Sequence, residues 1–348
     1  MRDNTLVIPS RADGEGPLNR SKIHARNAFA IHEGLTADRP IFGLCNFNAN
    51  VRSVLRSEPD GHCLARLRMK AVQRLGMKPT PLKIRSVTIG GREPAFILGP
   101  CVIESEKFVR RMAQKIAKIC DAENVSFIFK ASYDKANRTS VKSFRGIDAR
   151  AGCEILASIA RELKIPVTTD VHSPSEATMA GQFIDLLQIP AFLCRQTDLL
   201  KATAETGRTV NVKKGQFLAP WDVKNIAEKL EKFGAKQFLF TERGTTFGYN
   251  NLVADFRSLA WIREAGYRVM FDATHSVQRP GGAGESTSGD GELAPFLARA
   301  AMAAGCDGIF MEVHENPAAA LSDGPNQLPL KNLPKVLRVL KAVHAAVS

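Results

Sequence analysis

The sequence lacks any apolar run long enough to cross a membrane, and it has few aromatic side chains suited to stacking on bases. A membrane-spanning helix needs about 20 apolar residues in succession, and no stretch of the 348 residues approaches that length. Only three tyrosines and two tryptophans are present. We therefore expect neither a membrane-spanning protein nor one that binds nucleic acid by stacking.

The cysteine pattern does not suggest a disulfide framework. The seven cysteines are odd in number and scattered, and no two of them form a CxxC pair. Such usage indicates a reducing compartment, so we expect a cytoplasmic protein. The first residues contain no sustained apolar run before their first proline and glycine, which argues against a secretory signal.

The net charge of +13 is not concentrated in blocks of five or more like charges. A basic balance is compatible with nucleic acid, an anionic membrane surface or an anionic small substrate. Without basic blocks or many stacking aromatics, an anionic substrate is favoured. A non-catalytic barrel that binds anions or RNA remains the remote alternative.

The composition changes near residue 77, which predicts two parts. Residues 1–76 show no sustained periodicity, so we expect a flexible, poorly ordered N-terminal extension. Residues 77–348 are expected to form one domain, which begins with a short β-hairpin in MKPTPLKIRSVTIGG.

Short apolar runs alternate with segments of helical period from residue 94 onward. The predicted strands are 95–101, 126–131, 166–170, 185–190, 209–213, 237–241, 268–272 and 308–312. Predicted helices include 106–122, 149–163, 222–232, 255–264 and 292–304, and a last one at 331–347. This alternation predicts a (β/α)8 TIM barrel. An open doubly wound sheet is the alternative, but no GxGxxG opening supports it.

Polar residues follow all eight predicted strands, and a barrel gathers its strand ends on one face. Cations at this face suit phosphate and carboxylate groups, although any one of them can instead pair with a surface acid. The cations expected at the barrel mouth are Lys130, Lys135, Arg138, Lys213 and Arg243.

A second group of polar residues suggests a metal site. Cys101, His275 and Glu312 follow strands that become neighbours once a barrel closes, and Asp323 can fold back from the loop after the last strand. A thiolate, an imidazole and two carboxylates suit a divalent transition metal. Alternatively, Cys101 is a small buried apolar residue and His275 a satisfied core residue.

Several of these stretches resemble the 3-deoxy-D-manno-octulosonate 8-phosphate (Kdo8P) synthase family over about residues 83–345. The motifs are GPCVIES (99–105), FKASYDKANRTS (129–140), TTDVH (168–172), LLQIPAFLCRQTDLL (186–200), VNVKKGQF (210–217), ERGTTFGYNNLVADFR (242–257), FDATHSVQ (271–278) and MEVHENP with SDGPN (311–326). The related DAHP synthases typically carry KPRTS where this chain has KANRTS. Asn137 is therefore the position that separates the two.

The resemblance implies a transferase that condenses phosphoenolpyruvate, D-arabinose 5-phosphate and water into Kdo8P and phosphate, for lipopolysaccharide synthesis. A DAHP synthase acting on erythrose 4-phosphate is the alternative. The residues that match substrate-binding positions are Lys130, Lys135, Gln188, Lys213 and Arg243 for phosphoenolpyruvate, and Asn137, Arg138 and Thr139 for arabinose 5-phosphate. Arg195 matches an arginine that reaches a neighbouring subunit, which implies a homotetramer.

The resemblance also implies a metal-dependent enzyme, because that branch of the family has Cys at the position of Cys101 and the other branch has Asn. The implied ligands are Cys101, His275, Glu312 and Asp323, and the metal is zinc, iron, manganese or a similar divalent ion. Residues expected to take part in catalysis are Lys135, Asn137, Asp170, His275 and Asp323. No nucleic-acid or membrane partner is implied.

Overall fold

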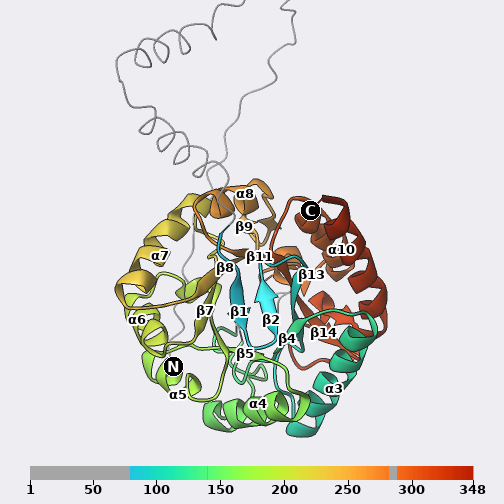
Figure 1. Ribbon diagram of the computed structural model, residues 1–348. Helices are drawn as coiled ribbons and strands as arrows, with labels where there is room; N and C mark the ends of the chain where they lie inside the picture. The colour runs from blue at the N-terminus through green and yellow to red at the C-terminus, as the bar shows by residue number, and fades with distance from the viewer. Residues whose placement is uncertain (1–78, 139, 282–287, 348) are drawn as a thin grey trace, which may run out of the picture. The chain divides into compact units, whose positions relative to one another are not determined.

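Eight parallel strands form a closed barrel in the part of the chain that the computed structural model describes, residues 79–138, 140–281 and 288–347 (Figure 1). The barrel strands are β3 (Ala95–Gly99), β4 (Phe127–Lys130), β5 (Val167–Asp170), β6 (Leu186–Ile189), β7 (Thr209–Lys213), β8 (Phe238–Glu242), β11 (Val269–Asp272) and β14 (Gly308–His314). Each pairs with the next in parallel, and β14 pairs with both β11 and β3, which closes the ring. The predicted TIM barrel is confirmed.

Helices surround the strands as an outer ring, which Figure 1 shows along the barrel axis. They are α3 (Glu106–Ala122), α4 (Ala149–Leu163), α5 (Pro174–Ala180), α6 (Thr197–Glu205), α7 (Val223–Lys232), α8 (Arg257–Glu264), α9 (Ala294–Ala303) and α10 (Leu333–Val347). The sequence analysis did not single out α5 and α6. α5 has seven residues and α6 has nine, fewer than most of the other helices.

Helix α3 shows how local sequence sets these elements. The Ser105 hydroxyl caps its start by accepting a hydrogen bond from the Phe108 N–H, and Glu106 lies in the first turn, where an acid is favoured. The apolar residues recur at helical spacing, and Val109, Met112 and Ile116 are fully buried. They pack in the layer between the helices and the barrel strands.

A short hairpin lies across one end of the barrel, as the sequence predicted. It consists of β1 (Leu82–Ile84) and β2 (Val87–Ile89), paired antiparallel. The hairpin side chains Ile84, Val87 and Ile89 pack with the apolar residues inside the barrel, which include Ile97, Ile128, Leu186, Leu239, Met270 and Phe310. The hairpin therefore closes the end of the barrel at which the strands begin, opposite the end where they finish.

Three short strand pairings lie next to the eight-stranded ring. β9 (Thr245–Thr246) pairs with β10 (Leu252–Val253), and β12 (Gln278–Arg279) pairs with β13 (Ser288–Gly289). β15 (Leu328–Pro329) extends the sheet by pairing with the end of β14. The predicted N-terminal extension, residues 1–76, lies outside the described residues.

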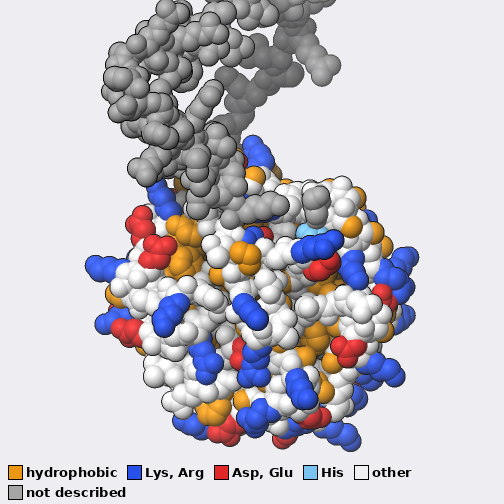
Figure 2. Space-filling view, viewed as in Figure 1, with side chains coloured by type: hydrophobic (Ala, Val, Ile, Leu, Met, Phe, Trp, Pro, Cys, Tyr) orange, Lys and Arg blue, Asp and Glu red, His pale blue; other side chains and the backbone are white. Residues whose placement is uncertain are grey.

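The cysteines form no disulfides within the described residues, and the surface charges of the face in Figure 2 are mixed. The five cysteines of the described residues are free thiols, all buried, and Cys120, Cys153 and Cys306 pack in the core. On the face in Figure 2, Lys and Arg side chains are spread among Asp and Glu side chains. Within the described residues, no helix combines the length and apolar character that crossing a membrane requires.

Candidate active site

A cavity of about 760 Å³ opens at the carboxyl ends of the barrel strands. The predicted site residues that line it are Lys130, Lys135, Asn137, Arg138, Asp170, Gln188, Lys213, Arg243, His275, Glu312 and Asp323. Cys101 is 1% exposed and touches Asp323, which is one of the lining residues. Arg195 is exposed and does not line the cavity. Thr139 lies outside the described residues.

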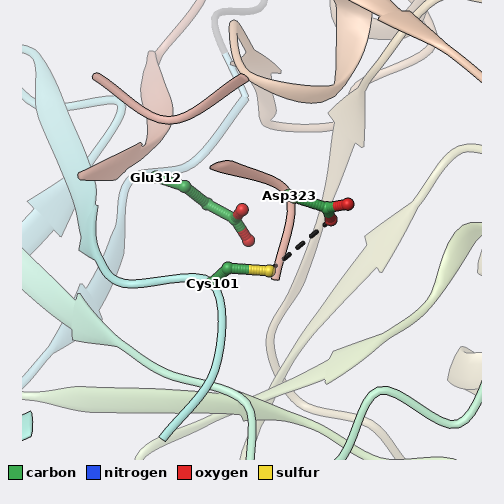
Figure 3. A group of neighbouring side chains, drawn as sticks. All are labelled: Cys101, Glu312 and Asp323. Carbon is green, nitrogen blue, oxygen red and sulfur yellow. Dashed lines mark hydrogen bonds between the residues drawn. The ribbon is translucent and has the colours of Figure 1, made fainter. Parts of the chain in front are cut away.

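Three of the four predicted metal ligands come together. Cys101 follows β3, Glu312 lies within β14 and Asp323 lies in the loop after β14, and their ligand atoms all fall within 4.8 Å of one another (Figure 3). The Cys101 Sγ lies 3.5 Å from the Asp323 Oδ2. The Glu312 Oε2 is buried and has no hydrogen-bond partner. One thiol and two acids therefore face a common point, and one carboxylate oxygen is left available there.

His275, the fourth predicted ligand, lies beside this trio rather than within it. Its Nε2 is 3.7 Å from the Glu312 Oε1, whereas its Nδ1 is 2.7 Å from the Asp272 Oδ2. The backbone N–H of His275 donates to the other Asp272 oxygen at 2.9 Å. Asp272 therefore fixes the ring and leaves the Nε2 facing Glu312, an arrangement typical of a histidine that ligates metal.

The surroundings of Cys101 hold its thiol in place. The Ser322 Oγ is 2.7 Å from the Cys101 Sγ, and the Gln327 Oε1 accepts a hydrogen bond from the Cys101 N–H at 3.3 Å. Burial, together with the nearby Glu312 carboxylate, raises the pKa of the Cys101 thiol far above its ordinary value. A bound cation would favour the thiolate at this position, because a metal ion deprotonates a thiol that coordinates it.

The glycine of the GPC motif allows this close arrangement. A Cβ on Gly99 would lie 1.8 Å from the Lys130 carbonyl oxygen, so any other residue would push β3 and β4 apart. The Lys130 side chain in turn reaches the cluster. Its Nζ donates to the Cys101 carbonyl and to the Glu312 Oε1, both at 2.8 Å.

The lysines keep the buried acids ionised. Burial alone would raise the pKa of Glu312, but Lys130, Lys135 and His275 hold it well below its usual range. Lys135 lies 3.7 Å from the Glu312 Oε1. Burial alone would lower the pKa of Lys135, but the surrounding Cys101, Glu312, Asp170 and Asp323 raise it well above its ordinary value. Lys135 is therefore a permanent positive charge next to the predicted metal ligands.

A second buried ion pair lies on the opposite side of His275. Lys213 donates to Asp272, and its Nζ also lies 3.2 Å from the centre of the Phe310 ring. Burial lowers the pKa of Lys213 to about 8, although the Asp272 carboxylate acts to raise it. Burial acts to raise the pKa of Asp272, and His275 and Lys213 outweigh it, so that this pKa lies well below its usual range.

Two arginines contribute further positive charge to the cavity. The Arg243 Nη2 donates to the Gln278 Oε1 at 2.7 Å. The Arg138 Nη1 is 3.7 Å from the Asp323 Oδ1, and its Nε donates to the Phe144 carbonyl at 3.2 Å. The Arg138 Nη2 is buried without a hydrogen-bond partner. An unpaired guanidinium nitrogen in a polar cavity is suited to bind an anion.

The cavity also contains residues to which the sequence analysis assigned no role. His172 lies between two acids, with its Nε2 3.3 Å from the Asp170 Oδ2 and its Nδ1 3.1 Å from the Glu176 Oε2. Burial opposes the charge on His172, but Asp170 and Glu176 raise its pKa. Asp272 and Gln278 are likewise in the cavity wall. His172 and Asp272 lie at or just after the ends of predicted strands, and that position is the sequence feature that could have identified them.

The model of the DAHP synthetase I family matches residues 72–348. The chain belongs to this family. Similar proteins include the 2-dehydro-3-deoxyphosphooctonate aldolases of Cyanothece sp. (strain PCC 7425), 56% identical over 75% of this chain and 96% of its own length, and of Synechococcus sp., 59% identical over 72% and 88%. A third, from Geobacter sulfurreducens, is 54% identical over 76% and 98%. That enzyme name denotes Kdo8P synthase, so the resemblance seen in the motifs is confirmed.

Proposed function

We propose that the protein condenses phosphoenolpyruvate with D-arabinose 5-phosphate and water to give Kdo8P and phosphate, as a transferase of lipopolysaccharide synthesis. The observation that carries the proposal is one cavity in which five cations lie beside a cluster of a thiol and two acids. The names of the similar proteins support the same activity. DAHP synthase activity is the weaker candidate, because Asn137 replaces the proline typical of that motif.

The cations of the cavity would hold two anionic substrates together. We assign Lys130, Lys135, Lys213, Arg243 and Gln188 to phosphoenolpyruvate, and Asn137, Arg138 and Thr139 to arabinose 5-phosphate. Fixed cations offset the repulsion between the two phosphorylated molecules, and their orientation brings the reacting carbons together. The unpaired Arg138 Nη2 provides a ready donor for a phosphate oxygen.

The chemistry joins the methylene carbon of phosphoenolpyruvate to the aldehyde carbon of the sugar. Water adds at C2, and the bond between C2 and the phosphate oxygen breaks, which releases phosphate. Lys135 would place its charge where the aldehyde oxygen becomes negative. Asp170 and Asn137 would orient the sugar, and the Asp323 carboxylate would help to move the proton of the attacking water.

The residues also fit one divalent metal ion, of which zinc, iron and manganese are candidates. Cys101, Glu312 and Asp323 would hold it, with the His275 Nε2 as the fourth donor. The unpartnered Glu312 Oε2 and the mixed sulfur and oxygen donors support this assignment. When bound, such an ion supplies Lewis acidity to an oxygen that gains negative charge.

Three further expectations belong to the same proposal. Arg195, exposed and outside the cavity of its own chain, would reach the sugar phosphate bound to a neighbouring subunit of a homotetramer. A cytoplasmic location follows from the substrates and from the buried free thiols. No nucleic-acid or membrane partner is proposed.

The choice of acceptor tests the activity directly. Phosphate release from phosphoenolpyruvate should have a kcat/KM at least about tenfold higher with arabinose 5-phosphate than with erythrose 4-phosphate. The measurement is a phosphate assay with each sugar in turn, with enzyme and no sugar as the control. Turnover with erythrose 4-phosphate alone would assign the chain to the DAHP synthases, and RNA binding without any turnover would support the non-catalytic alternative.

Metal removal tests the ligand assignment. We expect a chelator to abolish activity and added divalent metal to restore it, and elemental analysis should find about one metal ion per chain. Cys101→Asn should lose tight metal binding yet keep some turnover, because the metal-free branch of the family has Asn there.

Cys120→Ala is the matched control, because Cys120 is also a buried thiol but lies in α3 and packs in the apolar core. This variant should keep both metal and activity. Full activity in a preparation shown to be free of metal would refute the ligand assignment.

The pKa of Lys213 predicts a pH dependence. Its ammonium group is charged below about pH 8 and loses its charge above that, so kcat/KM for phosphoenolpyruvate should fall as the pH rises through about 8. Lys213→Arg should move this fall to higher pH, because a guanidinium stays charged. Lys232→Arg, at an exposed lysine of α7, is the control. A fall at pH 8 that persists in Lys213→Arg would assign it to another group.

We also propose that residues 77–348 fold and work without the N-terminal extension. Within the described residues, every strand from the hairpin to β15 pairs with another described strand, and the barrel closes on itself. A chain that begins at Met77 should keep the kcat/KM and the urea midpoint of the full chain. An insoluble or inactive truncated protein would reject the proposed boundary.

A further inference from the structure

The three chain segments that carry Cys101, Glu312 and Asp323 meet a second time, outside the ligand cluster. Glu104 lies three residues after Cys101, His314 lies two residues after Glu312, and Leu321 lies two residues before Asp323. The Glu104 Oε1 accepts a hydrogen bond from the Leu321 N–H at 3.0 Å and is 3.3 Å from the His314 Nε2. We infer that Glu104 is a positioning residue that holds Asp323 in place for the metal.

The histidine of this group is fixed on both sides. The Asn316 N–H donates to the His314 Nδ1 at 3.0 Å, so in the neutral ring the proton lies on Nε2, the nitrogen next to Glu104. The ring packs against Phe108, with 4.9 Å between the ring centres, and is almost fully buried. The approach of Nε2 to Glu104 is close but not aligned as a hydrogen bond. The bond to the Leu321 N–H is therefore the main link.

The loop that carries Leu321, Ser322 and Asp323 (the Asp323 loop) depends on the hydrogen bond between Leu321 and Glu104. Asp323 has a φ of 48°, in the left-handed region that a residue with a side chain adopts only at a cost. The Leu321 side chain is 49% exposed, so burial contributes little to holding this part of the loop. Ser322, between the two, contacts the Cys101 thiol at 2.7 Å. The Ser322 carbonyl also accepts a hydrogen bond from the Gln327 side chain at 2.7 Å. Losing the anchor at Leu321 would therefore loosen the loop on the side before Ser322 and shift Asp323 relative to the cluster.

Glu104 is not itself a donor of the cluster. The three donors that lie within 4.8 Å of one another are Cys101, Glu312 and Asp323. The effect of Glu104 must therefore pass through the backbone of Leu321. Partners of ligands of this kind typically change metal affinity by about 10- to 100-fold when they are removed. The inference rests on the metal site of the proposed function.

The experiment measures the dissociation constant for Co²⁺, by competition with a coloured chelator, in the full-length protein. Glu104→Ala should bind Co²⁺ about 10- to 100-fold more weakly than the wild type. Glu104→Gln keeps an oxygen that can accept the Leu321 N–H and should restore most of the affinity. Absorption from the Cys101 thiolate bound to Co²⁺ provides a second signal, which should weaken in parallel.

Glu315→Gln is the matched control. Glu315 is next to His314 in the chain, but it pairs with Arg111 and Lys115 of α3 instead of with the Asp323 loop. The substitution removes an acid and an ion pair from the same region but leaves the contact with Leu321 intact. Co²⁺ affinity should therefore stay within about twofold of the wild type.

Leu321→Pro covers the case in which Glu104→Ala fails to fold. This substitution removes the N–H donor at residue 321 and leaves the Glu104 carboxylate in place. Ala320, with φ −66° and ψ 135°, already has the backbone conformation that a residue before proline prefers. It should weaken Co²⁺ binding as Glu104→Ala does. Hydrogen exchange of the metal-free protein provides a separate measure, because the Leu321 amide should exchange faster in Glu104→Ala and not in Glu315→Gln.

The outcomes distinguish a failure of the metal site from a failure of the role of Glu104. Wild-type protein that binds no divalent metal would overturn the metal site and this inference with it. Tight binding by the wild type together with equally tight binding by Glu104→Ala, or by Leu321→Pro, would overturn only the role of Glu104. An equal loss of affinity in Glu315→Gln would show a general loosening of the loop and would also overturn that role.

Discussion

Closure of the barrel through β14 is the constraint on which the site depends. This strand pairs with β11 on one side and with β3 on the other, which puts Phe310 opposite Asp272 and Glu312 opposite Gly99. Because all the strands run in parallel, the residues that follow them emerge on one rim. Cys101 and Glu312, 211 residues apart in the sequence, become neighbours for that reason.

The buried charges on this rim are arranged in pairs that stabilise one another. Glu312 is paired with Lys130, and Asp272 with Lys213. Burying an unpaired charge costs several kcal/mol, so each partner makes the other acceptable in the interior. Among the buried atoms of the described residues that have no hydrogen-bond partner are a carboxylate oxygen of Glu312 and a guanidinium nitrogen of Arg138, both of residues that line the cavity. The free oxygen of Glu312 is suited to bind a cation, and the free nitrogen of Arg138 is suited to bind an anion.

The alternation of strands and helices was readable from the sequence, because each barrel strand is a short apolar run and most helices show a clear period. All eight strands were found, although the sequence put the end of the last one at residue 312 and the structure extends it to His314. The short helices α5 and α6 were not predicted, whereas α8, which is also short, was. The cavity residues, Asn137 and Gln188 among them, were predictable as polar residues at or just after strand ends, and the motifs of the family assigned them to the two substrates.

The sequence by itself determined the types of side chain at the strand ends and the family to which they belong. Tertiary structure decided which of them touch. It joined Cys101, Glu312 and Asp323, and it placed the Nε2 of His275 3.7 Å from the Glu312 Oε1. It also brought Glu104 to the backbone of Leu321, 217 residues away. No local pattern encodes such contacts, because they arise only when the ring of strands closes and the loops above it pack together.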